Sequence, residues 1–356
     1  MITTVNTIFC EIRQNKIMSE TLEIDGSIGG GSVLRVALPL AIGLKKEITI
    51  YNIRKNRSKP GLRTQHLVGV NALASITNSK VSGNTIGSGE IHFIPGTSNL
   101  DDIDIHANTA ASISLVFQAI CNFCIAAQSK VKVNFNGGGT HTEWSPSFDY
   151  LTKTFAPVLE MIGIHTEFHI DKFGFYPKGG ALGSFSIDAS NGVSVFDFSG
   201  KSTPLNIEAY VVCSSTLEKA NVAERIISSV NSNLNSPIVS YINYVDSLNP
   251  GIGITSVISY ENGMRKGMSI LGKKGVPSEN IGKQMSELVK NELSSSGVDE
   301  HMADQLLLPL AFSKGSQYRF QRVTDHVKVN LEILKQIIGD GLSYYKENEG
   351  FIVKCE

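Results

Sequence analysis

The chain has 356 residues, of which 41% are hydrophobic and 18% are charged, values that are typical of ordinary soluble globular proteins. Its 32 Lys and Arg residues and 33 Asp and Glu residues leave a net charge of −1, which excludes a protein that binds nucleic acid through an overall basic surface. Any phosphate site must therefore be a local cluster of cations. No run of about twenty apolar residues occurs, so no segment is predicted to span a membrane.

Residues 1–20 lack the apolar core and the cleavage site of a secretory signal, and we expect them to form an N-terminal tail. Met18 lies just upstream of the first strand pattern, TLEID, which begins at Thr21, so a natural start at Met18 is the alternative.

The cysteines have neither the spacing of a metal site nor that of a disulfide framework. They are Cys10, Cys121, Cys124, Cys213 and Cys355. Cys121 and Cys124 lie within an apolar helical pattern, so we expect them to be buried structural thiols. Such cysteine usage predicts a reducing compartment, and hence a cytoplasmic protein.

Short strand patterns alternate with amphipathic helix patterns along the chain. The strand patterns cover 47–53, 91–95, 130–135, 165–170 and 350–355. The helix patterns cover 62–77, 109–127, 147–161, 278–295, 302–313 and 327–338. This alternation predicts an α/β fold made of several units, each with a few strands and two helices, rather than one long parallel sheet.

The composition changes near Gly183. From there to about Gly275 the chain is rich in Ser and Asn and has its own strand patterns at 206–213 and 254–260, with a helix pattern that begins at Glu218. A chain of this length commonly has two domains. We therefore predict a small α/β domain at 184–275, inserted into a larger domain formed by 21–183 and 276–356.

A glycine turn follows the first strand pattern. Gly29, Gly30 and Gly31 connect that strand to a helix pattern that carries Arg35 in its first turns. Glycines permit close approach to the backbone, and the N–H groups at a helix start attract anions. Three glycines also suit an ordinary turn. Arg35 favours an anion site, because its guanidinium can be directed at whatever the turn holds.

A basic segment, NIRKNRSKPGLRTQHL, comes next. Arg54, Arg57 and Arg63, together with two lysines, concentrate positive charge within ten residues of a nearly neutral chain. Arginine suits bidentate contacts to phosphate, although a solvated loop is the alternative. Gln65 and His66 lie in the first turn of the following helix pattern and point in the same general direction.

Two later segments carry further candidates. In HMADQLLLPLAF, which begins a very apolar helix, His301, Asp304 and Gln305 share one face. His326 lies between a strand pattern and the helix pattern 327–338, beside N–H groups that favour phosphate. A neutral imidazole can attack phosphorus, but a lone histidine in a first helical turn is more often an ordinary polar residue.

Seven segments, in this order, resemble the RNA 3′-terminal phosphate cyclase family. They are IDGS..GGG..LR, IRKNRSKPGLRTQHL, the helix ending in LVFQ, GGGT..WSP..DY, GFYPKGG, HMADQLLLPLAF and the His-x-x-x-Asn of His326 to Asn330. The resemblance covers nearly the whole chain from about residue 21. It implies a large domain of repeated βαβαββ units with a smaller inserted α/β domain.

The resemblance also implies a reaction, the ATP-dependent conversion of an RNA 3′-phosphate to a 2′,3′-cyclic phosphate. In the family a histidine attacks the α-phosphorus of ATP, which gives a covalent histidyl-AMP and pyrophosphate. The AMP passes to the RNA 3′-phosphate, and the neighbouring 2′-hydroxyl then closes the ring and expels AMP. The expected partners are RNA 3′-phosphate ends, with no DNA specificity and no membrane, and a divalent metal (Mg or Mn) is expected beside ATP.

By position, His326 matches the family's nucleophile. The positions that match the lining of the triphosphate and RNA-end sites are Arg35, Arg54, Arg57 and Gln65, and those that match the nucleotide site are Gln118, His301, Asp304 and Gln305. The chain departs from the family at the glycine turn. Members usually carry Gly-x-Glu-Gly-Gly-Gly-Gln, whereas the turn from Ser27 to Ser32 is about two residues shorter and has no glutamate. That glutamate is associated with the metal, so no metal ligand is predicted here.

Two alternatives stay open. A non-catalytic relative that acts in ribosomal RNA processing shares the fold, and the shortened turn favours it. The presence of His326 with three matching arginines argues against it, because a scaffold needs no nucleophile. An enolpyruvyl transferase is built from similar units, but it would need a phosphate site without a nucleophilic histidine.

Overall fold

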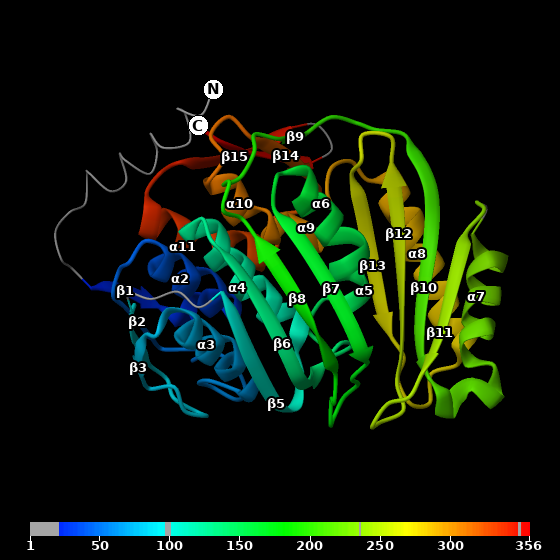
Figure 1. Ribbon diagram of the computed structural model, residues 1–356. Coiled ribbons are helices and arrows are strands. Elements are labelled where there is room, and N and C mark those ends of the chain that lie inside the picture. Colours follow the sequence, from blue (N-terminus) through cyan, green and yellow to red (C-terminus); the bar gives the residue numbers. More distant parts are fainter. Residues whose placement is uncertain (1–20, 97–100, 235, 348–349) are drawn as a thin grey trace.

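The computed structural model describes residues 21–96, 101–234, 236–347 and 350–356 (Figure 1). The predicted tail, 1–20, and Met18 within it lie outside these residues. The described chain forms four four-stranded sheets with helices packed against them, which confirms the predicted α/β class. None of the described helices is long and apolar enough to cross a membrane.

The first sheet and its helices form one βαβαββ unit. Its elements are β1 (Leu22–Asp25), α2 (Ser32–Gly43), β2 (Ile48–Tyr51), α3 (Thr64–Thr77), β3 (Lys80–Ser82) and β4 (Ile91–Ile94). The strands lie in the order β1-β2-β4-β3, with β1 and β2 parallel and the other pairs antiparallel.

The second unit repeats this arrangement, with the order β5-β6-β8-β7 and only β5 and β6 parallel. Its elements are β5 (Asp102–Ser112), α4 (Ile113–Ala127), β6 (Lys130–Gly139), α5 (Phe148–Tyr150), the π-helical η2 (Leu151–Phe155), α6 (Ala156–Met161), β7 (His165–Lys172) and β8 (Leu182–Asp188). The predicted helix 109–127 was wrong at its start. Residues 109–112 belong to β5, and Ser112 caps α4 by accepting a hydrogen bond from the N–H of Leu115 at 3.3 Å.

The third unit has the same topology, because β9 and β14 are parallel and the order β9-β14-β16-β15 matches that of the other two sheets. Its elements are β9 (Asp197–Phe198), α9 (Glu300–Gln305), α10 (Leu307–Ala311), β14 (Gln317–Phe320), α11 (Asp325–Ile338), β15 (Leu342–Glu347) and β16 (Gly350–Cys355). The predicted helix 302–313 is divided at Leu306 into α9 and α10. Pro309, which has no N–H to give to the preceding turn, follows this break.

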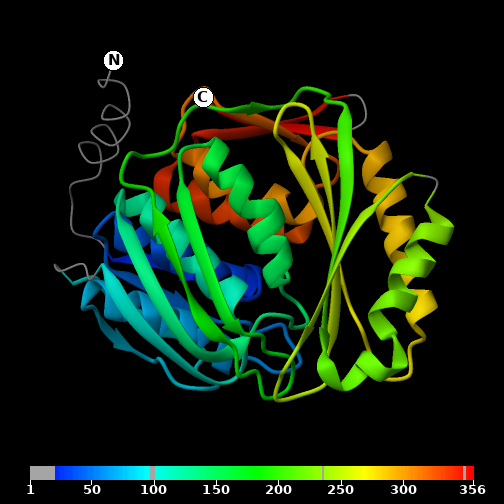
Figure 2. The same cartoon turned by 45° about the vertical axis from the view of Figure 1, so that its right-hand side comes forward.

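The fourth sheet lies in the chain between β9 and α9, and thus interrupts the third unit (Figures 1 and 2). Its elements are β10 (Pro204–Ser214), η3 (Ser215–Ala220), α7 (Val222–Asn233), β11 (Val239–Val245), β12 (Ile252–Tyr260), β13 (Arg265–Leu271) and α8 (Ser278–Ser294). Helices α7 and α8 pack together on one side of this sheet, where Arg225 pairs with Glu279 at 2.8 Å.

The domain limits 184–275 remain a prediction. The strand pairing suggests different limits, because β8 at the start of this range pairs with β6 and β7 of the second unit. Helix α8, which begins after the range ends, packs on α7. A small domain from about Pro204 to Ser294 would follow these contacts better.

Helix α2 is the centre of the large domain, where it packs against both α4 and α11. Every residue of α2 except Arg35 is buried. Gly43 makes the contact with α4 close, since an added Cβ would lie 2.5 Å from the Cβ of Ala126. Burial of α2 fixes the position of its N-terminus, where the glycine turn lies.

Among the described residues, the four cysteines are unpaired and buried, which confirms the prediction for Cys121 and Cys124. Burial raises the pKa of the Cys121 thiol to about 12. Cys10 lies outside the described residues.

Two glycine substitutions test this packing with opposite expected signs. Gly43→Ala should lower the free energy of unfolding by about 1–3 kcal/mol, because the new methyl group has no room against Ala126. Gly69→Ala, within α3 and with open space at its Cβ position, should raise it by about 0.5–1 kcal/mol. Chemical denaturation followed by circular dichroism measures both, and a stabilised Gly43→Ala protein would contradict the assigned α2–α4 contact.

Candidate active site

The glycine turn between β1 and α2 is a packing junction. A Cβ added to Gly29 would lie 2.7 Å from Cγ1 of Val329 in α11, and one added to Gly30 would lie 3.3 Å from Nη2 of Arg57. The bare backbone at Gly29 therefore allows α11, the helix that carries His326, to approach the turn. At Gly30 it allows the guanidinium of Arg57 to lie directly against the main chain.

Gly31 brings a third element to the same turn. A Cβ at Gly31 would lie 2.6 Å from Nε2 of His66 in α3 and 3.1 Å from Nη1 of Arg35 in α2. Gln65 lies beside them, in the lining of a small pocket that also includes Gly31, Arg35 and His66. The absence of side chains on the turn thus lets α2, α3 and α11 converge, whereas the anion site that the sequence suggested at this turn stays a prediction.

His66 is a neutral hydrogen-bond donor in this junction. Its Nδ1 accepts a hydrogen bond from the N–H of Arg63 at 3.0 Å, so Nε2 carries the proton and faces the turn. Burial, with the positive charges of Arg54, Arg35 and Arg63, lowers the pKa of His66 to about 3. The sequence marked His66 only as a polar group. Its position directly after Gln65 at a helix start was the available signal.

Arg35 is held in place by α4. Its Nε donates to Oε1 of Gln118 at 2.9 Å, and the side-chain amide of Asn122 donates to the carbonyl oxygen of Arg35 at 2.8 Å. Burial lowers the pKa of Arg35 to about 10, while the nearby charge of Asp304 acts in the opposite direction. Arg35 therefore stays cationic at neutral pH, and Gln118, one helical turn before Asn122, sets its direction.

Asp304 in α9 is the acidic group of the cluster. Burial raises the pKa of Asp304 to about 6. The charges of His301 and Arg35 act to lower it, and the charge of Asp299 acts to raise it. The amide nitrogen of Asn330 lies 3.2 Å from the carbonyl oxygen of Asp304 and 3.4 Å from its Oδ2. The other end of that amide, Oδ1 of Asn330, is buried without a hydrogen-bond partner among the described residues.

His326 lies in the first turn of α11, whose N-cap Thr324 accepts a hydrogen bond from the N–H of Val327 at 3.2 Å. The helix begins at Asp325, two residues earlier than predicted, and the His326 side chain remains exposed. Partial loss of hydration from the packing around the ring, followed by the charges of Arg35, His301 and Arg57, lowers the pKa of His326, while the charge of Asp325 acts in the opposite direction. The imidazole is therefore neutral and accessible at neutral pH.

The arginines of the basic segment have different structural roles. Nη1 of Arg54 donates to the carbonyl oxygens of Lys59 and Gly61, each at 2.9 Å, so Arg54 folds its own loop. Arg57 is exposed and lies over Gly30. Of these two side chains, Arg57 is the one that the loop presents to a ligand.

Gln305 is the predicted site residue that the structure does not join to this cluster. It is buried near the end of α9, and no hydrogen bond of its side chain is seen among the described residues.

The described residues contain no group of three or more His, Cys, Asp or Glu side chains that could hold a metal ion. The carboxylate of Asp25, next to the glycine turn, already accepts a hydrogen bond from the N–H of Ser27 at 2.9 Å, which lowers its pKa. These residues do not fit a metal site made by the protein alone, and we derive no catalytic step through one. A magnesium ion held by phosphates commonly needs only one or two carboxylates.

Comparison with known proteins identifies the family. The sequence matches the RNA 3′-terminal phosphate cyclase family over residues 27–342. It is 34% identical over 334 residues to the RNA 3′-terminal phosphate cyclase of Thermococcus kodakarensis, in an alignment that covers 90% of this chain and 94% of the relative. It is 31% identical over 338 residues to the RNA 3′-terminal phosphate cyclase of Ectopseudomonas mendocina, in an alignment that covers 92% of this chain and 96% of the relative.

The chain therefore belongs to the RNA 3′-terminal phosphate cyclase family. Its repeated βαβαββ units agree with the fold that the sequence resemblance implied.

The charges around His326 give a direct prediction for its titration. Asp325→Asn should lower the pKa of His326 further, because it removes a nearby negative charge that raises it. Arg57→Gln should move the pKa up toward the ordinary histidine value, because it removes a positive neighbour. Histidine ring signals followed by NMR across pH, with the His326 signal assigned from a His326→Gln variant, measure both shifts. Shifts in the same direction would contradict this arrangement.

Proposed function

We propose that this protein converts RNA 3′-phosphate ends to 2′,3′-cyclic phosphates with ATP, through a covalent histidyl-AMP and an RNA-adenylate intermediate. Its relatives are named RNA 3′-terminal phosphate cyclases, which supports a reaction of this kind. The observation that carries the mechanism is the position of His326, a neutral and exposed imidazole at a helix start beside Arg35 and Arg57.

In the first step, the unprotonated ring nitrogen of His326 attacks the α-phosphorus of ATP. A P–N bond forms, and the P–O bond to pyrophosphate breaks. Negative charge gathers on the phosphate oxygens and on the leaving pyrophosphate, and preoriented cations and N–H donors stabilise such charge. Arg57, Arg35 and the Nε2–H of His66 surround the glycine turn where those oxygens would lie.

In the second step, an oxygen of the RNA 3′-phosphate attacks the adenylyl phosphorus, and the P–N bond breaks to return His326. In the third, the 2′-hydroxyl attacks the activated 3′-phosphorus, its proton is lost, and AMP leaves. Because the closing nucleophile is a 2′-hydroxyl, the product requires RNA at the terminal position.

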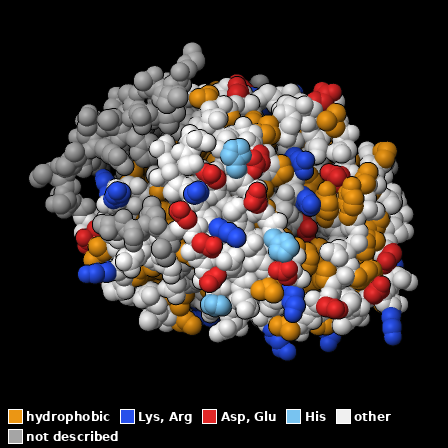
Figure 3. Space-filling model, viewed as in Figure 1, with side chains coloured by type: hydrophobic (Ala, Val, Ile, Leu, Met, Phe, Trp, Pro, Cys, Tyr) orange, Lys and Arg blue, Asp and Glu red, His pale blue; other side chains and the backbone are white. Residues whose placement is uncertain are grey.

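We propose ATP as the second substrate and Mg or Mn as a cation carried mainly by its phosphates. Binding should be confined to the RNA end. On the face shown in Figure 3, Lys and Arg side chains are interspersed with Asp and Glu side chains rather than gathered in one track, as the net charge of −1 also suggests. The unpaired, buried cysteines support our proposal of a cytoplasmic protein.

The alternative function is that of a non-catalytic relative in ribosomal RNA processing. The observation that favours it is the short glycine turn, Ser27 to Ser32, which has no glutamate for a metal. Covalent labelling of the protein separates the two functions.

Incubation with α-labelled ATP and Mg or Mn should place acid-labile label on the protein, and His326→Ala should abolish it. His165→Ala is the matched control, since His165 is an exposed histidine paired with Glu160 at 2.8 Å outside the cluster. Label should remain on that variant. A wild-type protein that takes up no label with either metal would contradict the cyclase proposal and favour the non-catalytic relative.

Two arginine variants test the separate roles of the basic segment. Arg57→Ala should slow label uptake at least about tenfold without changing the thermal unfolding temperature, because its side chain is exposed and no hydrogen bond of it is seen within the described part of the chain. Arg54→Ala should lower both the rate of label uptake and the thermal unfolding temperature, because it removes two hydrogen bonds that shape the loop. Calorimetry beside the labelling assay measures the difference. Equal destabilisation in the two variants would show that Arg57 is structural.

A further inference from the structure

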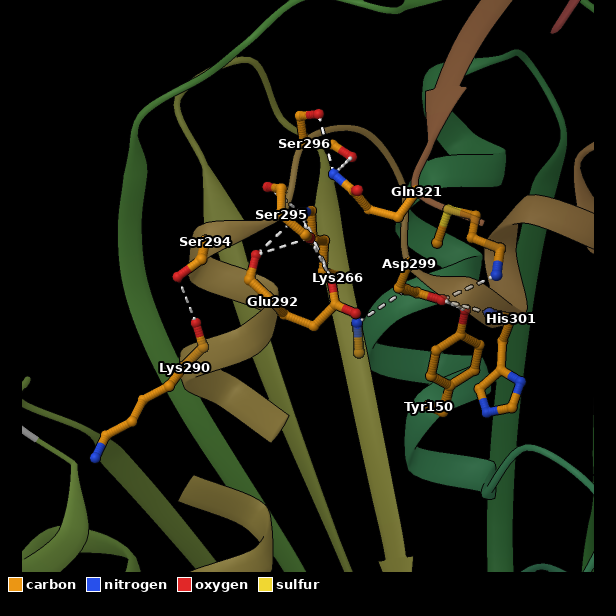
Figure 4. Close-up of polar contacts among 12 residues, drawn as sticks. Tyr150, Lys266, Lys290, Glu292, Ser294, Ser295, Ser296, Asp299, His301 and Gln321 are labelled. Atoms are coloured by element: carbon orange, nitrogen blue, oxygen red, sulfur yellow. Dashed lines mark hydrogen bonds and ion pairs between the residues drawn. The ribbon is translucent and has the colours of Figure 1, made fainter. Parts of the chain in front are cut away.

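Asp299, the N-cap of α9, is a buried carboxylate with four hydrogen bonds (Figure 4). Its Oδ1 accepts from the hydroxyl of Tyr150 at 2.8 Å and from the N–H groups of His301 and Met302 at 3.0 and 2.9 Å. Its Oδ2 accepts from the N–H of Gly267 at 3.0 Å. An ordinary N-cap satisfies the helix start alone. This one also binds two other elements of the fold.

Those two elements come from different parts of the molecule. Tyr150 ends α5 of the second unit, and Gly267 belongs to β13 of the fourth sheet. Gly267 has to lack a side chain here, because an added Cβ would lie 2.6 Å from Cδ2 of Tyr150 and 2.4 Å from Oγ1 of Thr154. The tyrosine ring therefore packs closely against the backbone of β13 while its hydroxyl reaches Asp299.

Lys266, the residue before Gly267, binds the other end of the segment that leads from α8 to Asp299. The ammonium of Lys266 donates to the carbonyl oxygens of Glu292 and Ser295, at 3.1 and 2.9 Å, and to the Ser295 hydroxyl at 2.7 Å. Figure 4 shows Lys266 beneath the end of α8, with Asp299 and His301 on the other side of the strand. Consecutive residues of β13 thus hold both ends of the segment that leads from α8 to α9.

The contacts of Asp299 connect β13 to the candidate active site, because α9 carries two of the site's residues. The ring of His301 packs edge-on against the ring of Tyr150, with centroids 5.4 Å apart. Asp304, one turn later in α9, contacts Asn330 of α11 and acts on Arg35. No hydrogen bond links Asp299 itself to Arg35, Asn330 or His326 among the described residues. Its influence on the site has to pass through the position of α9.

We propose that Asp299 is a positioning residue, which fixes α9 against β13 and Tyr150 and so couples the fourth sheet to the placement of His301 and Asp304 for the adenylylation of His326. Only the kinetic part of this proposal rests on the proposed function. The structural coupling can be measured without any activity.

The variant that tests it is Asp299→Asn. The amide keeps the size of the side chain, but it removes the charge and turns an NH₂ group toward at least one of the present donors. We expect amide hydrogen exchange in α9 to accelerate at least about tenfold, since the cap and the link to Gly267 are both weakened. We expect label uptake from ATP to slow by about a hundredfold, the effect of a displacement of about 1 Å in an active site.

A second measurement separates positioning from general damage. A synthetic RNA that ends in a 3′-adenylate needs only the closing step, in which His326 neither forms nor breaks a bond. Asp299→Asn should slow its cyclisation less than tenfold, and thus far less than label uptake. A purely structural role would slow both steps alike.

Two further variants keep the test decisive if Asp299→Asn folds poorly. Tyr150→Phe removes one donor and leaves the ring against His301, so it should change the same two measurements in the same direction by smaller factors. Asp188→Asn is the matched control. Its carboxylate accepts two hydrogen bonds from Ser190 in an exposed turn, and its loss should change neither measurement.

Wild-type exchange in α9 together with wild-type label uptake in Asp299→Asn would overturn the proposal, as would equal slowing of both steps in Tyr150→Phe. A wild-type protein that takes up no label would remove the proposed function, while the exchange measurement would still decide whether Asp299 couples α9 to β13.

Discussion

The approach of three helices to one bare turn of backbone is the constraint on which the site depends. Gly29, Gly30 and Gly31 have no side chains, so α2, α3 and α11 can present Arg35, His66 and His326 within the same small volume. The cost of this convergence is mutual repulsion. The pKa values of all three groups are lowered, in part by their neighbours' charges for the two histidines. A bound polyphosphate would relieve that repulsion, which supports the proposal that this cluster binds ATP.

The sequence predicted the α/β class because the alternation of strand and helix patterns is local. It predicted less well where partners lie far away in the chain. The predicted helix 109–127 began too early because residues 109–112 look helical by composition but belong to β5, where Ser112 pairs with Gly139 of β6. The limits of the small domain depend on which sheet β8 joins and which helix α8 packs against. Neither partner can be predicted from a change in composition.

For the site, too, local motifs were predicted better than contacts between distant residues. The glycine turn, Arg35, Gln118 and His326 come together as the motifs suggested. The loop-folding role of Arg54 and the isolation of Gln305 could not be predicted, because both depend on the path of the backbone. Asp299 was missed, and Asn330 was noted only as the last residue of a motif, for a similar reason. Their importance comes from partners that lie between 26 and 149 residues away in the sequence.

The interruption of the third unit also has a consequence for the order of folding. Strand β9 is two residues long, and its parallel partner β14 lies 120 residues later in the chain. The first two units can close as soon as they leave the ribosome, but the third cannot do so until the whole intervening sheet has been synthesised. A loop of that length costs little more entropy to close if it is already compact. A small sheet that had already folded would leave the ends of the last unit less distance to cover, and α11 with His326 is synthesised after that sheet.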